Sequence, residues 1–214
     1  MQFSEGCPYL IGIAGPSCSG KTELAGRIAR RLAAPVVSID SYYRELGHLT
    51  LDERARVNFD EPAAIDEPLL HSHLKALARG EAVLCPTYDF ATHSRTERLH
   101  PVPAAEFVVV EGLFALYWPE VRALLQTAVY VDTPDAVCFE RRLRRDTRER
   151  GRSEESVRRQ YAATVRPMAE RYVWPTRQYA DVVVSGEASL DTSAAAVLEH
   201  IARMRARSAH PSLP

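Results

Sequence analysis

The segment GPSCSGKT at residues 15–22 constrains the fold of this chain more than any other feature. It fits the pattern G-x-x-x-x-G-K-[ST], in which glycines let successive backbone N–H groups curl around a phosphate. The pattern requires a strand before it and a helix after it. Residues 9–14 are a short apolar run, and residues 22–32 repeat apolar side chains at helical spacing. We therefore predict a phosphate-binding loop between a strand and a helix.

Individual residues of this loop have expected roles. Lys21 is placed to reach the β- and γ-phosphates of a nucleotide, and Thr22 is placed to ligate Mg²⁺. Only two of the 27 basic residues in the chain are Lys, which favours a role at position 21 for a compact point charge. The residues that we expect to bind the nucleotide are Gly15, Pro16, Ser17, Cys18, Ser19, Gly20, Lys21 and Thr22.

Short apolar segments alternate with helical segments along much of the chain. This alternation predicts an α/β fold of the P-loop type, a parallel sheet with helices on both faces. We expect one domain over residues 1–207 and a disordered tail over residues 208–214. The expected strands are residues 9–14, 35–39, 107–110, 128–131 and 181–184, and the expected helices are residues 22–32, 68–79, 119–125, 134–150, 154–164 and 190–207.

Residues 41–104 interrupt this alternation. Residues 44–67 are polar and irregular, with several acidic side chains. Residues 82–88 and 95–102 predict two antiparallel strands of a β-hairpin that turns at residues 89–94. We therefore expect a small hairpin-containing insertion in the α/β domain.

Two carboxylates stand at the ends of buried strands. Asp40 follows the strand expected at residues 35–39, and Glu111 follows the strand expected at residues 107–110. The carboxyl ends of parallel strands meet at one edge of the sheet, where ligands bind. One carboxylate can hold Mg²⁺ and the other can accept a proton from an attacking hydroxyl. Taken singly, each also fits a surface acid or a helix cap, but their shared placement favours a functional role.

Composition excludes several classes of protein. Of 214 residues, 46% are hydrophobic and 26% are charged, as in a globular domain rather than a disordered chain. The formal net charge of −1 argues against a globally basic nucleic-acid binder, and no apolar run is long enough to span a membrane. The four cysteines are dispersed, which argues against a zinc site or a disulfide framework. We expect a cytoplasmic protein with neither nucleic acid nor a membrane as a partner.

An arginine-rich segment lies between residues 141 and 152, where seven of twelve residues are Arg and nearby acids balance the charge only in part. A solvated helix face, a nucleic-acid patch and a mobile lid over a phosphate site are three interpretations of such a run. The phosphate loop in the same chain favours the lid, because a kinase must exclude water and stabilise charge on the transferred group. Arg145, Arg148 and Arg152 would share one face of the expected helix, with Gly151 as a hinge.

The motifs together resemble those of the uridine–cytidine kinase family over residues 9–187. The matching segments are GPSCSGKT (15–22), SIDSYYR (38–44), VNFDEP (57–62), PTYDFATHSR (86–95), VVVEG (108–112), RRLRRDTRERGR (141–152), QYAATVRP (160–167) and QYADVVV (178–184). The resemblance implies phosphorylation of the 5′-hydroxyl of uridine and cytidine by ATP or GTP with Mg²⁺, in pyrimidine salvage. It also implies that residues 41–104 bind the nucleoside, that residues 141–166 form a lid, and that the chain forms a homo-oligomer such as a tetramer.

The resemblance further implies roles for single residues. Asp40 matches the catalytic base of the family. The residues that match its Mg²⁺ shell are Thr22 and Glu111, with Asp40 beside them. Arg145, Arg150 and Arg152 match its lid residues near the phosphates. Of these, Arg145 is expected to bind the nucleotide, and Arg150 and Arg152 are expected to be catalytic together with Lys21. The ribose contacts are matched by Asp60, Arg142 and Gln160, and the base pocket is matched by Tyr43, Phe59, Tyr88, Phe90 and His93.

The chain departs from the family in two places, and other functions remain open at this stage. Cys18 stands where a small residue such as Ala is expected, and residues 185–188 lack the basic residue expected after the last strand. The first alternative is a related P-loop kinase that acts on another sugar or a small alcohol. The second is a nucleotide-dependent switch that binds nucleic acid through the arginine-rich segment. The absence of an N-K-x-D motif argues against a GTPase.

Overall fold

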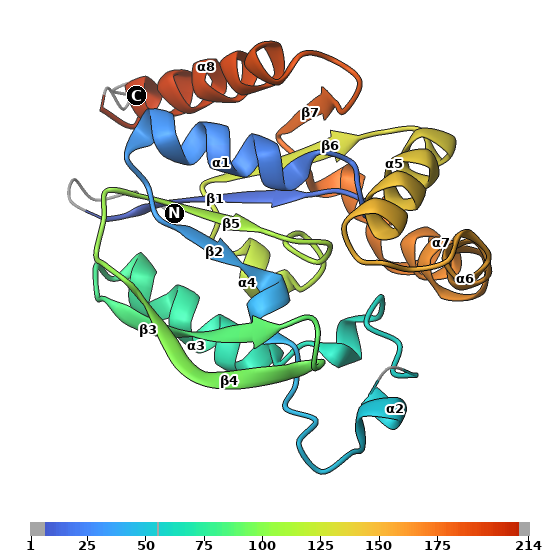
Figure 1. The fold of residues 1–214 in the computed structure, drawn as a ribbon. Coiled ribbons are helices and arrows are strands. Elements are labelled where there is room, and N and C mark those ends of the chain that lie inside the picture. The colour runs from blue at the N-terminus through green and yellow to red at the C-terminus, as the bar shows by residue number, and fades with distance from the viewer. Residues whose placement is uncertain (1–6, 55, 210–214) are drawn as a thin grey trace.

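A five-stranded parallel sheet forms the centre of the computed structural model, which describes residues 7–54 and 56–209 (Figure 1). The strand order is β2-β5-β1-β6-β7, and all four neighbouring pairs are parallel. The strands are β1 (Tyr9–Ala14), β2 (Val36–Ser38), β5 (Phe107–Glu111), β6 (Thr127–Asp132) and β7 (Val182–Ser185). The predicted parallel α/β fold is therefore confirmed.

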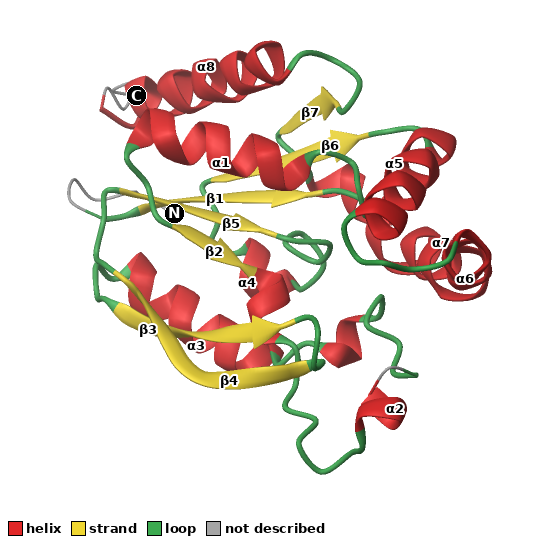
Figure 2. Ribbon diagram, viewed as in Figure 1, coloured by secondary structure: helices red, strands yellow, loops and turns green. Residues whose placement is uncertain are grey.

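Helices cover both faces of this sheet, because its strands are apolar on both sides (Figure 2). In β1, Leu10 and Ala14 face one core, while Ile11 and Ile13 face the other. The first core is closed by α3 (Glu67–Ala78) and α4 (Pro119–Arg122), and the second is closed by α1 (Lys21–Leu32) and α8 (Leu190–Ala209). The carboxyl ends of the parallel strands lie at one edge of the sheet, and packing on both faces fixes the position of that edge.

The insertion between β2 and β5 contains the expected hairpin. Strands β3 (Val83–Asp89) and β4 (Ser94–Val102) pair antiparallel and form a separate two-stranded sheet beside α3. The polar segment before α3 contains the short helix α2 (Leu51–Arg54) and a 3₁₀ turn over Pro62–Ala64. Helix α3 begins where the Asp66 carboxylate accepts a hydrogen bond from the backbone N–H of Leu69 at 3.3 Å.

The arginine-rich helix is shorter than the sequence predicts. Helix α5 (Asp135–Arg148) ends before Arg150, and Gly151 has a left-handed φ of 63°. Arg152 therefore lies beyond the helix, and the prediction that it shares a helical face with Arg145 and Arg148 is wrong. The chain then turns at Ser153, whose hydroxyl caps α6 (Glu154–Gln160).

Helical structure continues past the end predicted at residue 164. It runs through π-type turns at Tyr161–Val165 and Ala169–Val173, through α7 (Arg166–Met168), and through a 3₁₀ segment at Trp174–Tyr179. At the other end of the chain, α8 extends two residues past the predicted limit of 207, and the rest of the predicted tail, residues 210–214, lies outside the described residues. Within the described ranges, no helix is long and apolar enough to cross a membrane.

Candidate functional site

The phosphate loop joins β1 to α1 in a conformation that only particular residues adopt. Gly20 has a φ of 99°, which an L side chain rarely adopts. A Cβ at Gly15 would lie 2.7 Å from Ser19 Oγ and 2.8 Å from the carbonyl of Val131, so only glycine fits there. Cys18 has a φ of 63°, which places a non-glycine residue in the left-handed region at the tip of the loop.

On one side, the phosphate loop is anchored by hydrogen bonds to later parts of the chain. On the other side, in front, its backbone N–H groups are available. The carbonyl of Ser19 accepts hydrogen bonds from Thr133 Oγ1 at 3.1 Å and from Arg141 Nη1 at 3.4 Å. In front, helix α1 begins at Lys21 and has no side-chain cap, which leaves the first backbone N–H groups available to an anion. Lys21 Nζ donates to the carbonyl of Pro16 at 3.3 Å. This arrangement fits a phosphate group bound in front of the loop, as the sequence predicts.

Thr22 and Glu111 meet at the edge of this loop. Thr22 Oγ1 donates to Glu111 Oε2 at 3.2 Å, and Ser38 Oγ donates to Glu111 Oε1 at 2.8 Å. The carboxylate of Glu111 is buried at 5% exposure, and its oxygens and the Thr22 hydroxyl are ligands of the kind that Mg²⁺ prefers. No cluster of three or more His, Cys, Asp or Glu side chains that could hold a metal occurs among the described residues. The two oxygen donors therefore fit Mg²⁺ that is also bound by nucleotide phosphates.

Asp40 lies on the first turn after β2, in the 3₁₀ segment Ile39–Tyr42. Burial raises the pKa of its carboxyl to about 6, against the opposing positive charge of Lys21. The nearby carboxylates of Glu111 and Asp60 raise the pKa further. A carboxylate with a pKa close to neutrality is suited to accept a proton near pH 7.

An aromatic cluster stands beside Asp40 and joins the hairpin to the polar insertion. The ring centroids of Tyr43 and Phe59 lie 5.0 Å apart, those of Tyr43 and Tyr88 lie 5.1 Å apart, and those of Tyr88 and Phe90 lie 5.2 Å apart. His93 stacks on Phe59 at 5.2 Å with an interplanar angle of 13°. All five side chains predicted for the base pocket are therefore brought together.

His93 occupies the hairpin turn in a strained conformation. Its φ of 49° lies in the left-handed region. Burial lowers the pKa of its imidazole below 6.5, although the Asp89 carboxylate opposes this shift. A neutral imidazole carries one hydrogen-bond donor and one acceptor.

Asp60, Arg142 and Gln160 form a polar wall next to the aromatic cluster. Burial raises the pKa of Asp60, and the positive charge of Arg142 is the largest opposing influence. Arg142 Nη1 donates to Ser17 Oγ at 3.0 Å, and Arg142 Nη2 donates to Gln160 Oε1 at 3.1 Å. Arg142 thus connects the phosphate loop with the two other residues for which ribose contacts are predicted.

One cavity of about 1480 Å³ contains most of these groups. It exceeds the volume of about 300–1,000 Å³ that one small ligand needs, so it has room for a nucleotide and a second substrate. Its lining includes most of the phosphate loop, Asp40, the aromatic cluster, the polar wall and the arginines 145, 150 and 152. Three predicted residues do not line it: Gly15 and Pro16 form the base of the loop, and Glu111 is buried behind Thr22.

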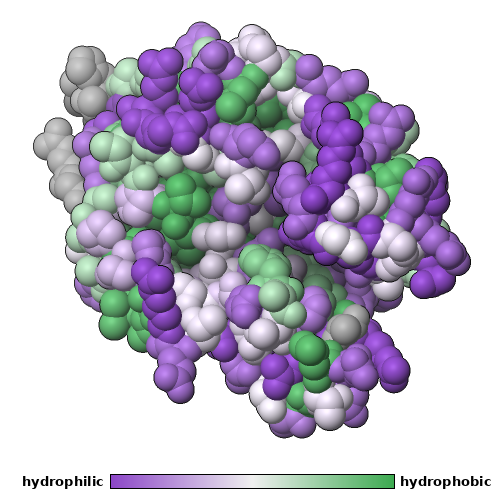
Figure 3. Space-filling view, viewed as in Figure 1, coloured by the Kyte–Doolittle hydropathy of each residue, from purple (hydrophilic) through white to green (hydrophobic). Residues whose placement is uncertain are grey.

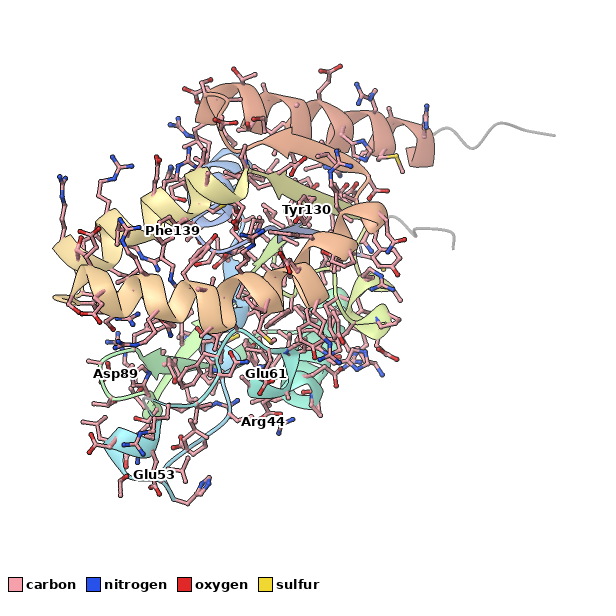
Figure 4. The ribbon with its side chains drawn as sticks, turned by 90° about the vertical axis from the view of Figure 1, so that its right-hand side faces the viewer. Arg44, Glu53, Glu61, Asp89, Tyr130 and Phe139 are labelled. Atoms are coloured by element: carbon pink, nitrogen blue, oxygen red, sulfur yellow. The ribbon has the colours of Figure 1, made fainter. Side chains whose placement is uncertain are left out.

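The surface around this cavity is strongly polar. Figure 3 shows mostly hydrophilic residues over α5 and α6, at the right of the view. Figure 4 views the molecule from that side, with Phe139 on α5, the helical segment that includes α6 in front, and Asp89 of the hairpin below it. Arg150 lies above the ring of Phe90 with 5.9 Å between its guanidinium carbon and the ring centroid. The arginine-rich segment thus contacts the hairpin.

Sequence reasoning missed a further wall of the cavity, after the last strand. Arg141 Nη2 donates to the carbonyl of Gly186 at 2.9 Å, and a Cβ at Gly186 would lie 1.9 Å from Thr133 Oγ1. Ser185, Gly186 and Ala188 line the cavity although the expected basic residue is missing from this segment. Arg141 brings a positive charge to it from α5. The position of these residues at the end of a parallel strand was the available signal.

Sequence reasoning also missed Arg95, on β4. Arg95 Nε donates to the carbonyl of Tyr43 at 2.8 Å, and Arg95 Nη2 donates to the carbonyl of Tyr42 at 3.1 Å. Its charge is paired with Asp66 at 3.1 Å. The guanidinium ties the hairpin to the turn that carries Asp40, and its only sequence signal is its place after His93 and Ser94 in the segment PTYDFATHSR.

The sequence resembles that of known proteins over most of its length. The profile of the Phosphoribulokinase / Uridine kinase family matches residues 10–193. A uridine kinase of Chloroflexus aggregans is 50% identical over 192 residues, which cover 87% of this chain and 89% of that protein. A uridine kinase of Vibrio cholerae is 42% identical over 182 residues, which cover 82% of this chain and 85% of that protein.

Solved structures share the fold at lower identity. A putative fructose transport system kinase from Silicibacter has a TM-score of 0.69 and 21% identity, and the match covers 86% of this chain and 93% of that one. Phosphoribulokinase from Rhodobacter spheroides has a TM-score of 0.62 and 16% identity, with coverage of 85% and 71% respectively. These neighbours share the arrangement of the parallel sheet and its helices.

Proposed function

Because the chain belongs to the Phosphoribulokinase / Uridine kinase family, we propose that it phosphorylates the 5′-hydroxyl of uridine and cytidine. The phosphate donor is ATP or GTP, and the products are UMP or CMP and the nucleoside diphosphate. The observation that carries this proposal is a single cavity in which the phosphate loop and the aromatic cluster are both exposed, with Asp40 in its lining.

The aromatic cluster supports a nucleoside as the acceptor. A pyrimidine ring stacks on aromatic faces, and Tyr88, Phe90 and His93 line the cavity. The neutral imidazole of His93 offers a donor or an acceptor to position 4 of the base, where uracil has a carbonyl and cytosine has an amino group. Asp60 can accept hydrogen bonds from two ribose hydroxyls, with Arg142 beside it.

The transfer follows from these positions. The oxygen of the 5′-hydroxyl attacks the γ-phosphorus, and the bond from the γ-phosphorus to the β–γ bridging oxygen breaks with its electron pair on the diphosphate. The carboxylate of Asp40 accepts the proton from the hydroxyl. Lys21, Arg145, Arg150 and Arg152 are proposed to stabilise the negative charge that spreads over the transferred group.

The metal has a place in this scheme. Thr22 and Glu111 would hold Mg²⁺, with Asp40 beside them, and the ion supplies neutralisation of charge on the β- and γ-phosphate oxygens. We place the reaction in the cytoplasm, where the free thiols of Cys18, Cys85 and Cys138 stay reduced. The homo-oligomer expected from the family resemblance stays a prediction.

A nucleoside panel tests the proposed function. Purified protein is given MgATP and uridine, cytidine, thymidine, adenosine or ribose, and nucleoside diphosphate release is followed by a coupled assay. We expect turnover with uridine and cytidine that is lost in Asp40→Asn. Turnover with ribose or another sugar but with no nucleoside would favour the related sugar kinase, and turnover that depends on RNA or DNA would favour the switch.

A further inference from the structure

One buried carboxylate stands at the centre of the arginine-rich segment. Asp146 lies on α5 and is 0% exposed. Four guanidinium groups surround it, at 2.9 Å from Arg145, 3.5 Å from Arg142, 3.5 Å from Arg152 and 3.6 Å from Arg150. The backbone carbonyl of Asp146 also accepts from the N–H of Arg152 at 3.1 Å, which ties the turn after α5 back to the helix. The cluster of Asp146 and these four arginines is here called the arginine hub.

The four arginines depend on Asp146 to different degrees. Arg142 and Arg152 both donate to Gln160 Oε1, and they have further partners in Ser17 and Ser156. Arg145 and Arg150, in contrast, have Asp146 as their only ion-pair or hydrogen-bond partner for the side chain among the described residues. Removing the Asp146 charge would therefore affect chiefly Arg145 and Arg150, which line the cavity.

Charge explains why the hub needs a central anion. Four like charges that converge on a half-buried site repel one another, and the repulsion is strongest where water is excluded. A single carboxylate cancels one of the four charges and leaves an excess of three to face an incoming polyphosphate. The remaining charge attracts the donor, while the carboxylate fixes where each guanidinium lies.

We propose that Asp146 is a positioning residue for phosphoryl transfer, which holds Arg145 and Arg150 where charge develops on the transferred group. This inference rests on the proposed kinase function. It assigns Asp146 no contact with substrate, since its side chain is fully buried behind the arginines. A carboxylate that only stabilised the fold would influence the free energy of unfolding but not the balance between donor binding and the rate of transfer.

The variant Asp146→Asn tests the proposal, because it keeps the shape of the side chain and removes its charge. We expect kcat to fall by about 10- to 100-fold. This is the usual cost of losing a residue that orients the ligands of a metal ion, and Asp146 would orient Arg145 and Arg150 in the same way. The dissociation constant for inorganic tripolyphosphate, measured by calorimetry, should stay within about threefold of wild type, because lost orientation is offset by the loss of one repelling negative charge. A kcat within about threefold of wild type, or an equal loss of kcat and tripolyphosphate affinity, would overturn the proposal.

Asp135→Asn is the matched control. Asp135 is a carboxylate on the same helix, it pairs with Arg166 at 3.7 Å and with Tyr161, and it is absent from the cavity lining. Its loss should lower the melting temperature with kcat unchanged. If both variants lower kcat equally, the effect on Asp146→Asn is one of helix stability and the proposal fails.

A double-mutant cycle locates the effect. If Asp146 acts through Arg145, then Arg145→Ala should cost much less in the Asp146→Asn background than in wild type. Additive losses would mean that the two residues act separately, which contradicts the inference. If Asp146→Asn does not fold, Asp146→Glu keeps the charge and moves it by one methylene. Reduced kcat with retained tripolyphosphate affinity then supports the proposal, and wild-type kcat overturns it.

The measurement of tripolyphosphate binding separates this inference from the proposed function. A wild-type protein that binds tripolyphosphate but phosphorylates no nucleoside would contradict the proposed function. In that case, the transfer role of Asp146 falls with it. A wild-type protein that is an active nucleoside kinase, with Asp146→Asn equally active, would contradict only the role of Asp146.

Discussion

Arg95 Nε donates a hydrogen bond to the backbone carbonyl of Tyr43 at 2.8 Å, from a strand of the hairpin to the turn that carries Asp40. The same guanidinium also donates to the carbonyl of Tyr42, so Arg95 ties the hairpin to two consecutive residues of the turn that carries Asp40. We therefore expect Arg95 to influence the position of Asp40, the proposed proton acceptor. A substitution at Arg95 can therefore test whether this side chain contributes to activity as well as to stability.

Replacing Arg95 with Lys should raise the KM for uridine and lower kcat together, each by about tenfold, because a single ammonium cannot bridge two carbonyls and the Asp66 carboxylate. The unfolding free energy should fall by about 1.5–3 kcal/mol, the usual cost of losing hydrogen bonds to a charged group. Steady-state kinetics and urea unfolding measure the two effects. Arg98→Lys is the control, since Arg98 is exposed on the same strand, and normal kinetics in Arg95→Lys would contradict the role.

Asp40→Asn should reduce kcat by about 10²–10⁴ with little change in nucleoside affinity, because the amide keeps the shape but cannot accept the proton. Rapid-quench or steady-state assays at saturating MgATP and uridine give kcat, and calorimetry gives the affinity for uridine. A folded Asp40→Asn enzyme with near-normal kcat would remove Asp40 from the mechanism.

Lys21→Arg should abolish most activity while the protein stays folded. Lys21 is buried at 9% exposure and reaches the carbonyl of Pro16 within the loop, so the wider guanidinium has no room there. Circular dichroism and ATP turnover check the two halves of this expectation. The chain uses Arg at almost every other basic position, so an active Lys21→Arg protein would show that the loop accepts either cation.

His93→Phe should lower kcat/KM for uridine and for cytidine by about tenfold or more, since it keeps the ring that stacks on Phe59 and removes both polar atoms. The ratio between the two substrates should change less than either value, because one neutral imidazole serves both bases. Wild-type discrimination of more than about a hundredfold between uridine and cytidine would contradict this assignment, as would unchanged values in the variant.

The protonation of His93 gives a prediction for pH. Burial lowers the pKa of the folded-state imidazole below 6.5, so the unfolded chain takes up this proton first as the pH falls. The site therefore reduces the free energy of unfolding as the pH drops below about 6.5, and it has no effect at higher pH. A proton NMR titration, with His93→Phe to assign the signal, should show a midpoint below 6.5. A midpoint above 6.5 would mean that Asp89 outweighs burial.

Local sequence signals were enough to predict the sheet, the phosphate loop and the hairpin. Each strand of the sheet is short and apolar on both faces, which is specific to a parallel sheet covered by helices. The Gly–Lys–Thr ending of the loop required a strand before it and a helix after it. Because parallel strands end at one edge, the positions of Asp40 and Glu111 followed from the strands alone.

Features that depend on tertiary contacts could not be predicted in this way. Arginine favours helices, so nothing before Gly151 indicated that α5 ends at Arg148. Pro167 and Pro175 made the helical segment that ends at Tyr179 hard to assign, because proline usually breaks a helix interior. In sequence, Asp146 is one acid that partly balances many arginines, and only the folded chain shows that four of them converge on it.

The phosphate loop depends on contacts with residues outside the motif. The carbonyl of Ser19 is bonded to Thr133 and Arg141, which lie more than a hundred residues further along the chain, and Gly186 packs against the same loop. A synthetic peptide of residues 9–32 would carry the whole consensus but lack everything that orients it. Inserting residues 15–22 into another protein would therefore transfer the motif sequence without its affinity for phosphate. The recipient protein would also need equivalents of Thr133, Arg141 and a closely packed glycine.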